Sequence, residues 1–353
     1  MFGPLMVGTC TSRPSSATTL SEMPAPIPQK MTHHKISSAA SSTGIPAAQN
    51  TVGTESVLNS GDATDSSCGT PFDNLASLIP SCNKWNLGSP ARLAYRTRVK
   101  IEKCLQLGKG CYVYVNGVTA TTLTQIDNAL ESYGIRRQVR IMFEPGFSCI
   151  IIKCIVGVPH ERIRWTFMTE IMDKICEISN HGKDSYHPTG CRRYWGKSGG
   201  CNEGDGGLAP AGTRDGEEAW PSIVLEVGDS QRIEALHACA VWWLTESNSQ
   251  TRMVILINLT KEPVNLRLEL WAMVTDPENP GTQSRPRKIP GFKQFFNLNS
   301  EGKVINHHEE YQNLVIPYRT IFDVPHDDAI NITLSQADLK AWILRLSKGL
   351  SWD

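Results

Sequence analysis

Two carboxylates in unlike sequence contexts could together bind a divalent cation. Asp205 lies in the glycine-flanked segment GDGGLAP, and Glu226 follows 21 residues later inside the apolar segment SIVLEVG. Mg²⁺ and Mn²⁺ prefer oxygen ligands, and Mg²⁺ often takes one or two carboxylates together with water and a phosphate oxygen. A cation held by this pair would lower the pKa of a bound water and neutralise charge on a scissile phosphate. The two acids therefore predict a metal site for phosphodiester cleavage.

The two carboxylates differ in how strongly their surroundings require a function. An aspartate in a glycine-rich loop most often caps its own backbone, so Asp205 alone is explained as a turn residue. A carboxylate inside a central strand costs several kcal/mol to desolvate unless a metal, a cation or a proton compensates it. Alternation places Glu226 on the same face as Val224 and Gly228. We expect that face to line a cleft, although at an open sheet edge Glu226 would simply be solvated.

A helix at about 160–179 supplies a third candidate acid. Ile163, Phe167 and Ile171 recur at the helical period, which predicts an apolar stripe that faces the core. Glu170 points toward the same side, three positions after Phe167. It either completes the acidic site or lies at the margin of the stripe and pairs with Lys174 one turn later.

Other elements are expected around these acids. The turn Tyr133-Gly134 ends a helix, and Ser335 with Asp338 forms a capping box that begins another at 335–346. The segment 275–300 contains Pro and Gly and is expected to be a connection. The predicted strands lie at 139–145, 148–157, 222–228, 252–259 and 265–273, and a further helix lies at 232–244.

Composition divides the chain into an arm and one folded domain. Residues 1–70 contain 22 Ser or Thr, six Pro and one aromatic residue, Phe2, which is too little apolar surface to offset the entropy of ordering. We therefore predict a disordered arm at 1–83 and a single domain at 84–353. The 35 basic and 35 acidic residues indicate no partner by net charge. We expect an intracellular protein, cytoplasmic or nuclear, with no membrane partner, because no secretory signal or long apolar run is present.

Cysteine and histidine offer two alternatives. The 11 cysteines include no CxxC pair, so a disulfide framework is not expected. His181, His187, Cys191 and Cys201 could surround a zinc ion, but their spacing fits none of the usual compact templates. A cysteine hydrolase would use Cys191 or Cys239, and neither has the glycine-flanked context of a nucleophile turn.

The motifs together resemble the PD-(D/E)XK nuclease superfamily, which has the restriction-endonuclease-like fold. The resemblance covers residues 135–346 and is closest to fungal proteins similar to the bacterial Uma2 endonuclease family. Its order is a helix acid, an Asp in a turn, and a Glu inside an apolar strand that a helix follows. The matching segments are VRIMFEP, SCIIIKCIVG, PHERIRWTFMTEIMDKI, EGDGGLAP, WPSIVLEVGDSQ, VWWL, MVILINL, LVIPY and LSQADLKAW.

The resemblance implies an α/β (α+β) fold with a central mixed sheet flanked by helices, and cleavage of DNA or RNA with Mg²⁺ or Mn²⁺. Asp205 would be the first metal ligand, Glu226 the second and Glu170 the supporting acid. The motif lysine, two places after Glu226, is Gly228 here. The only basic residue near the start of the next helix is Arg232, which either clamps a phosphate oxygen or is a solvated helix-start residue. Arginine is no equivalent of the lysine, because it is bulkier and forked.

Two functions remain open from the sequence. The first is a metal-dependent nuclease, for which Tyr194 and Trp195 would suit base stacking, although RRYW is equally well explained as a surface patch. The second is a non-catalytic nucleic-acid or protein binding module on the same fold, which the missing lysine favours. Nothing in the sequence indicates an oligomeric state. The candidates for phosphate contacts in the first case are Arg136, Arg137, Arg140, Arg192, Arg193 and Lys197.

Overall fold

The computed structural model describes residues 70–155, 157–178, 181–229, 231–261, 264–305, 313–323 and 330–348. All of them belong to one compact unit, Asp65–Asp353. Most of the expected arm lies outside the described residues. Helix α1 (Pro71–Leu78) falls within the range 1–83, begins with a capping box of Thr70 and Asp73, and buries Phe72 and Leu75. It packs against helix α5 (Ile233–Glu246).

The first sheet along the chain, here called sheet A, has six strands in the order β1-β2-β4-β3-β7-β6. β1 and β2 are parallel, and the other neighbours are antiparallel. The hairpin of β3 and β4 confirms the strands predicted at 139–145 and 148–157. The strands are β1 (Lys84–Asn86), β2 (Cys111–Asn116), β3 (Val139–Glu144), β4 (Cys149–Cys154), β6 (Arg193–Trp195) and β7 (Cys201–Glu203).

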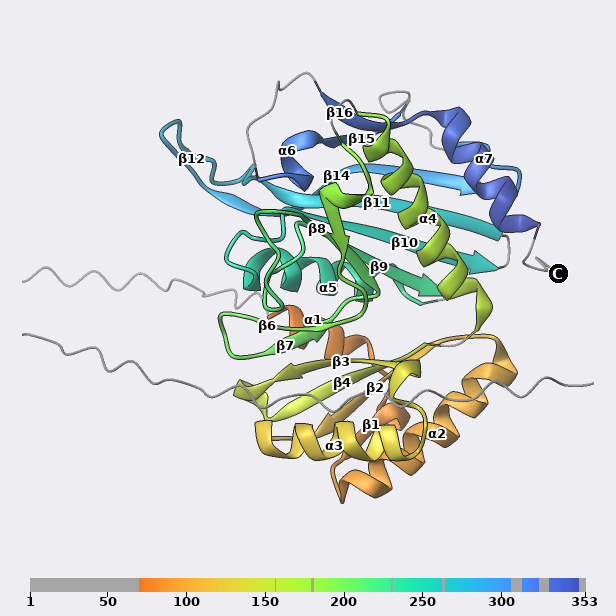
Figure 1. Cartoon of the computed structure of the whole chain (residues 1–353). Helices are drawn as coiled ribbons and strands as arrows, with labels where there is room; N and C mark the ends of the chain where they lie inside the picture. Colours follow the sequence, from red (N-terminus) through yellow and green to blue (C-terminus); the bar gives the residue numbers. More distant parts are fainter. Residues whose placement is uncertain are drawn as a thin grey trace, which may run out of the picture. The chain divides into compact units, whose positions relative to one another are not determined.

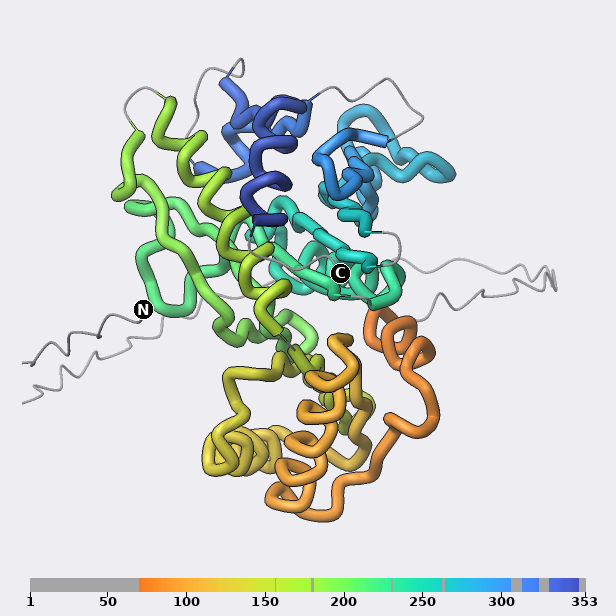
Figure 2. Tube along the Cα trace, turned by 90° about the vertical axis from the view of Figure 1, so that its right-hand side faces the viewer, coloured from red at the N-terminus to blue at the C-terminus, as the bar shows by residue number. Residues whose placement is uncertain are grey.

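Helices α2 (Pro90–Leu107) and α3 (Ala120–Ser132) lie together on one face of sheet A (Figure 1). The segment that leads from α1 to α2 can be followed in orange in Figure 2. Alternation along β4 directs Ile150 and Ile152 toward these helices, and Ile151 and Lys153 toward the opposite face. In β4, the face toward these helices is therefore apolar, whereas the opposite face carries the charge of Lys153.

The second sheet, sheet B, has six strands in the order β14-β11-β10-β9-β8-β5. β9 and β10 are parallel and are joined by α5, whereas the other neighbours are antiparallel. Strand β14 occupies the second half of the segment 275–300, which was expected to be a connection and in which Pro290 and Gly291 had concealed the strand pattern. The strands are β5 (Tyr186–Pro188), β8 (Gly206–Pro210), β9 (Ile223–Asp229), β10 (Met253–Lys261), β11 (Val264–Thr275) and β14 (Lys288–Asn299).

The fold is mixed α/β, with seven α-helices in the described residues. One central sheet was expected, whereas the described residues form two large sheets. Strands β2, β3 and β4 bury side chains on both faces, so they are covered twice: by α2 and α3 on one side, and by α1 and α5 on the other. These strands consequently build a second layer and do not extend sheet B.

Sheet B is also covered on both faces. Helices α4 (Val158–Cys176) and α7 (Gln336–Ser347) pack on one face, and α5 packs on the other. The apolar stripe of α4 and the capping box of Ser335 and Asp338 are both confirmed. In β9, Ile223, Leu225 and Val227 face α4, whereas Val224 contributes to the core around α5. By alternation Glu226 points to the α5 side.

The remaining described elements are short. Strands β15 (Leu314–Pro317) and β16 (Asn331–Leu334) form an antiparallel pair. Helix α6 (Tyr318–Ile321) follows β15 directly and precedes β16 along the chain. A two-stranded ribbon of β12 (Gly281–Thr282) and β13 (Arg285–Pro286) precedes β14. No helix among the described residues has both the length and the apolar character needed to cross a bilayer.

Candidate functional site

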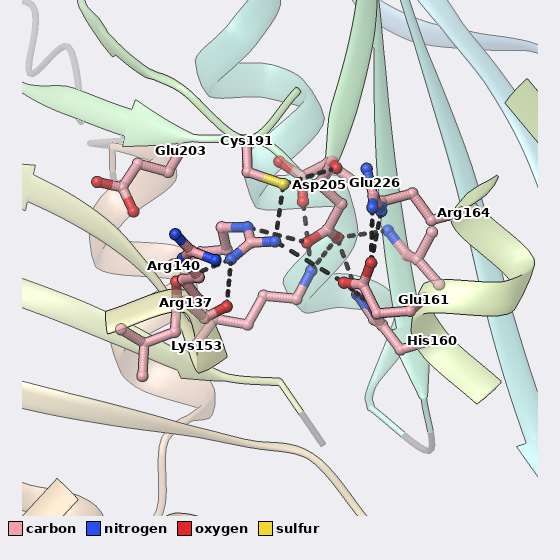
Figure 3. Close-up of polar contacts among 12 residues, drawn as sticks. Arg137, Arg140, Lys153, His160, Glu161, Arg164, Cys191, Glu203, Asp205 and Glu226 are labelled. Atoms are coloured by element: carbon pink, nitrogen blue, oxygen red, sulfur yellow. Dashed lines mark hydrogen bonds and ion pairs between the residues drawn. The ribbon is translucent and has the colours of Figure 1, made fainter. Parts of the chain in front are cut away.

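Five charged or titratable side chains meet between sheet A and sheet B, and we call them the buried charged cluster (Figure 3). They are Arg140 on β3, Lys153 on β4, His160 in the first turn of α4, Asp205 just before β8, and Glu226 in β9. The exposed fraction is 0% for Asp205, 2% for Glu226 and 5% for Lys153. Charges this deeply buried persist only when they are paired or neutralised.

Lys153 is the centre of the cluster. Its Nζ lies 2.5 Å from Asp205 Oδ2 and 3.3 Å from Glu226 Oε2, so one ammonium contacts both acids. Sequence reasoning missed this residue. The signal was nevertheless present, because Lys153 interrupts the apolar run SCIIIKCIVG just as Glu226 interrupts SIVLEVG.

Further donors complete the surroundings of the two carboxylates. Asp205 Oδ2 accepts a hydrogen bond from the Val227 backbone N–H at 2.8 Å and lies 3.2 Å from His160 Nε2. Arg140 Nε is 3.6 Å from Asp205 Oδ1. Glu226 Oε1 accepts from the indole N–H of Trp243 at 2.9 Å. Asp205 is thus enclosed by cationic groups, whereas Glu226 has one ammonium and one neutral donor.

This difference sets the charges of the cluster. Burial acts to raise the pKa of Asp205, but Lys153 and His160 outweigh it and hold that pKa well below its usual range. For Glu226 the order is reversed: burial, with added repulsion from Asp205, raises the pKa to about 7 despite Lys153. Burial acts to lower the pKa of Lys153, and the two carboxylates overcome it and raise that pKa. At neutral pH, Lys153 and Asp205 are therefore an ion pair, and Glu226 is partly protonated.

The cluster reaches the surface through the first turn of α4. His160 Nδ1 lies 3.6 Å from Glu161 Oε1, and the half-exposed Glu161 accepts from Arg164 Nη2 at 2.6 Å. Arg140 Nη2 donates to Cys191 Sγ at 2.8 Å, and this thiol donates to the Asp205 carbonyl at 3.2 Å. Polar contacts thus run from Asp205 to the half-exposed side chain of Glu161.

Glu170 does not join the other predicted acids. It lies nine residues beyond Glu161, about 13 Å further along α4, and its carboxylate pairs with Arg345 of α7. Its expected alternative partner, Lys174, pairs instead with Glu177 at 3.1 Å and with Asp338 at 3.6 Å. The apolar stripe of α4 correctly predicted that Glu170 points away from solvent. Helix α7, and not the buried charged cluster, lies on that side of α4.

The positions of the motif lysine and of Arg232 have separate explanations. A Cβ at Gly228 would meet Asn258 Oδ1 at 2.5 Å and Leu236 Cδ1 at 3.0 Å, so a side chain there would require these neighbours to move. Arg232 is the N-cap residue of α5, is exposed, and pairs with Glu234 at 3.3 Å. It corresponds to the solvated helix-start alternative. Lys153, from the other sheet, provides the ammonium that neither position supplies.

The basic residues expected to contact phosphate are mostly engaged inside the protein. Arg136 and Arg193 both pair with Glu203, at 2.5 and 2.7 Å, and Arg140 belongs to the buried charged cluster. Arg192 donates to a backbone carbonyl, and Tyr194 is buried, whereas Arg137, Lys197 and Trp195 are exposed. These residues therefore do not form one open basic surface around the acids.

The four residues considered as an alternative zinc site make separate contacts. His181 contacts the Tyr318 hydroxyl at 2.8 Å, and His187 contacts Asp215 at 2.9 Å. Within the described ranges, no three His, Cys, Asp or Glu side chains are placed to hold a metal ion together. A shared zinc site of these residues has no support in this geometry.

The candidate nucleophilic thiols are also unsuited to their chemistry. Burial raises the pKa of Cys191, and burial together with Glu226 raises the pKa of Cys239 well above its usual value. A nucleophilic cysteine requires the opposite shift, toward the thiolate. A cysteine hydrolase is therefore not favoured.

The residues around Asp205 and Glu226 do not fit a divalent cation. Both carboxylates share Lys153, and the remaining Asp205 oxygen faces the Arg140 guanidinium. A doubly charged ion would be repelled by both cations. The cavity beside Glu226 and Lys153 has a volume of about 10 Å³, which is roughly the space of one water molecule.

Comparison with known proteins adds no family assignment. No protein-family model matches the chain, and no curated protein matches its sequence. Membership of the PD-(D/E)XK superfamily therefore remains a prediction from the motifs.

Proposed function

We propose that this chain is a non-catalytic nucleic-acid-binding module built on a nuclease-like core. The observation that carries the proposal is the position of Lys153 Nζ, which contacts Asp205 and Glu226 at 2.5 and 3.3 Å where a catalytic cation would be needed. The two acids pair with Lys153, and these contacts join sheet A to sheet B. They stabilise the fold and have no hydrolytic role.

Space supports this proposal as strongly as charge does. Hydrolysis needs a phosphodiester, an attacking water and a metal ion together beside the acids. The cavity beside Glu226 has a volume of about 10 Å³, which holds one water molecule but neither a phosphodiester nor a metal ion with its ligands. Strands β3 and β4 of sheet A cover the position from which a strand of nucleic acid would have to approach. Substrate would reach Glu226 only if the two sheets separated.

The nuclease-like core is proposed from the arrangement of sheet B. Helix α4 precedes the antiparallel strands β8 and β9, and α5 connects β9 to the parallel strand β10. The two acids lie at the start of β8 and within β9, in the order that the resemblance implies. The fold is retained in this proposal, and the metal site is not.

The second candidate is a metal-dependent nuclease in which Lys153 replaces the motif lysine from another strand. Its support is the contact of one ammonium with both acids, as that motif would require. Incubation of the wild type and of Glu226→Ala with labelled single- and double-stranded DNA and RNA, in Mg²⁺, Mn²⁺ or EDTA, separates the candidates. We expect no metal-dependent cleavage from either protein. Cleavage by the wild type that disappears in Glu226→Ala would overturn the non-catalytic proposal.

A further inference from the structure

A groove with an unusual composition runs along α2 and the edge strand β1. It consists of two adjoining hollows with volumes of about 330 and about 470 Å³. Both are within the range of roughly 300 to 1,000 Å³ that is typical of small-molecule sites. We call it the α2 groove and define it by Lys84, Trp85, Arg92, Tyr95, Arg96 and Lys103.

The α2 groove is strongly basic in a chain that is neutral as a whole. Five of the residues that line it are Lys or Arg, and none of its lining residues is Asp or Glu. Lys84, Arg92 and Lys103 make no ion pair with any residue in the described ranges, so their charges are available to a ligand. The one acid of α2, Glu102, pairs with Arg98 outside the groove. Charge complementarity therefore selects an anionic partner.

An aromatic and guanidinium pair divides the two hollows. The Arg96 guanidinium lies 4.1 Å from the centre of the Trp85 ring, and the Trp85 indole N–H donates to the Cys82 carbonyl at 3.3 Å. This cation–π contact places the guanidinium over the ring, and Arg96 is partly exposed. Beside it Tyr95 is 57% exposed. Unpaired bases stack on aromatic rings and on arginine planes of this kind.

The spacing of these groups fits an extended strand. Arg92, Arg96 and Lys103 occupy one side of α2, and the first and last are about 16 Å apart along the helix axis. Stacking needs bases that are not paired, because paired bases in a duplex are already stacked and enclosed. An acidic peptide would use the charges of the groove, but Asp and Glu side chains have no aromatic ring to stack on the Arg96–Trp85 pair.

We propose that the α2 groove binds single-stranded nucleic acid, with phosphates on Lys84, Arg92 and Lys103 and a base on the Arg96–Trp85 pair. The inference deepens the proposed function, and it rests on that function only in expecting the bound strand to stay uncut. The groove and the acids are independent in space, since α2 packs on the face of sheet A opposite to the one that carries Lys153. In Figure 1, α2 lies on the far side of β1, β2 and β4 from sheet B.

Fluorescence anisotropy with labelled oligo-dT and oligo-U, the same sequences as duplexes, and polyglutamate as competitor tests the inference on the full chain. We expect tighter binding of the single strands than of the duplexes and weak competition by polyglutamate. Arg96→Ala should weaken binding roughly tenfold, the loss expected for one stacked base. Arg92→Ala/Lys103→Ala should lower the slope of log K against log salt by roughly 1.4, because two phosphate contacts are lost.

The matched control removes two charges of the same region from outside the groove. Arg98→Ala/Lys109→Ala should bind the single-stranded oligonucleotides within about twofold of the wild type, although it loses the same number of positive charges, since neither side chain lines the groove. Thermal unfolding of every variant checks that the fold is intact.

The outcomes separate the two proposals. Binding that survives in Arg96→Ala and Arg92→Ala/Lys103→Ala would overturn the α2 groove and leave the proposed function standing. Equal competition by polyglutamate would overturn the choice of nucleic acid. Bound oligonucleotide that is shortened on a denaturing gel would overturn the non-catalytic proposal and leave the groove standing. Absence of all binding would overturn both.

Discussion

Replacement of Lys153 by Met tests whether its ammonium holds the two acids in place. Methionine keeps the length and apolar stem but removes the one cation in the described part of the chain that contacts both carboxylates. Asp205 would keep the Val227 N–H, His160 and Arg140, whereas Glu226 would keep only the Trp243 N–H. Removal of one partner from a buried ion pair costs about 3–5 kcal/mol, because the other charge stays buried.

The cost should depend on pH in a defined direction. Without Lys153 the pKa of Glu226 rises further, and an acid with a raised folded pKa loses stability as pH rises above its unfolded value. Lys153→Met should therefore lower the free energy of unfolding by about 3–5 kcal/mol at pH 8, and by less at pH 6, where Glu226 takes up a proton. Urea unfolding followed by the fluorescence of the nine tryptophans measures both values.

Lys293→Met is the matched control, since Lys293 also lies on a strand, β14, but is exposed. Its effect should stay within about 0.5 kcal/mol. The double variant Lys153→Met/Glu226→Gln should recover part of the loss, which gives the coupling between the two residues. A cost for Lys153→Met no larger than that of the control, at either pH, would refute the reasoning.

Three further changes follow from the same geometry. The free energy of unfolding of the wild type should fall as pH rises from about 5 to 8, because the folded pKa values of Glu226 and His160 are both raised. In urea titrations, Glu226→Gln should make this fall with pH smaller. An unchanged pH dependence in the variant would contradict the role of Glu226. Gly228→Lys should destabilise by about 1–3 kcal/mol through its clash with Asn258, with no gain of cleavage; a stable, active variant would argue for the motif lysine. Glu170→Gln should cost about 1 kcal/mol or less, because its partner Arg345 is half-exposed; a loss as large as that of Lys153→Met would be inconsistent with this placement.

The parts of the fold that local pattern specifies could be predicted from the sequence. The end of α3 at Tyr133-Gly134, the hairpin of β3 and β4, and the capped helix α7 each depend on residues within a few positions of one another. Helix α2 was not predicted. Its buried side mixes the apolar residues Leu93 and Ile101 with the small or polar residues Ala94 and Thr97, so large apolar residues alone do not mark that side.

The candidate site was predictable only in part, because its decisive contact is not local. Asp205 and Glu226 come from neighbouring strands of one sheet, and their order along the chain was enough to bring them together. Lys153 comes from another sheet, 73 residues before Glu226. The hydrophobic periodicity of a strand does not indicate which other sheet packs on it. The role of Lys153 could therefore be recognised only in the folded structure.

The same limit explains Glu170 and the arginines. Helical periodicity correctly directed Glu170 inward, but it does not say which helix lies there, and Arg345 of α7 is the partner. Arg136 and Arg193 appeared as possible phosphate contacts because sequence gives charge without a partner. Glu203 satisfies both inside the fold. A charge within an apolar strand, as at Lys153 and Glu226, proved the more informative signal.

Calorimetric titration of Mn²⁺ into the wild type and into Asp205→Asn/Glu226→Gln tests the central claim most directly. If the ammonium of Lys153 already neutralises the two acids, neither protein should bind Mn²⁺ at this position, and their titrations should be the same. One equivalent of Mn²⁺ bound by the wild type and lost in the double variant would contradict the account.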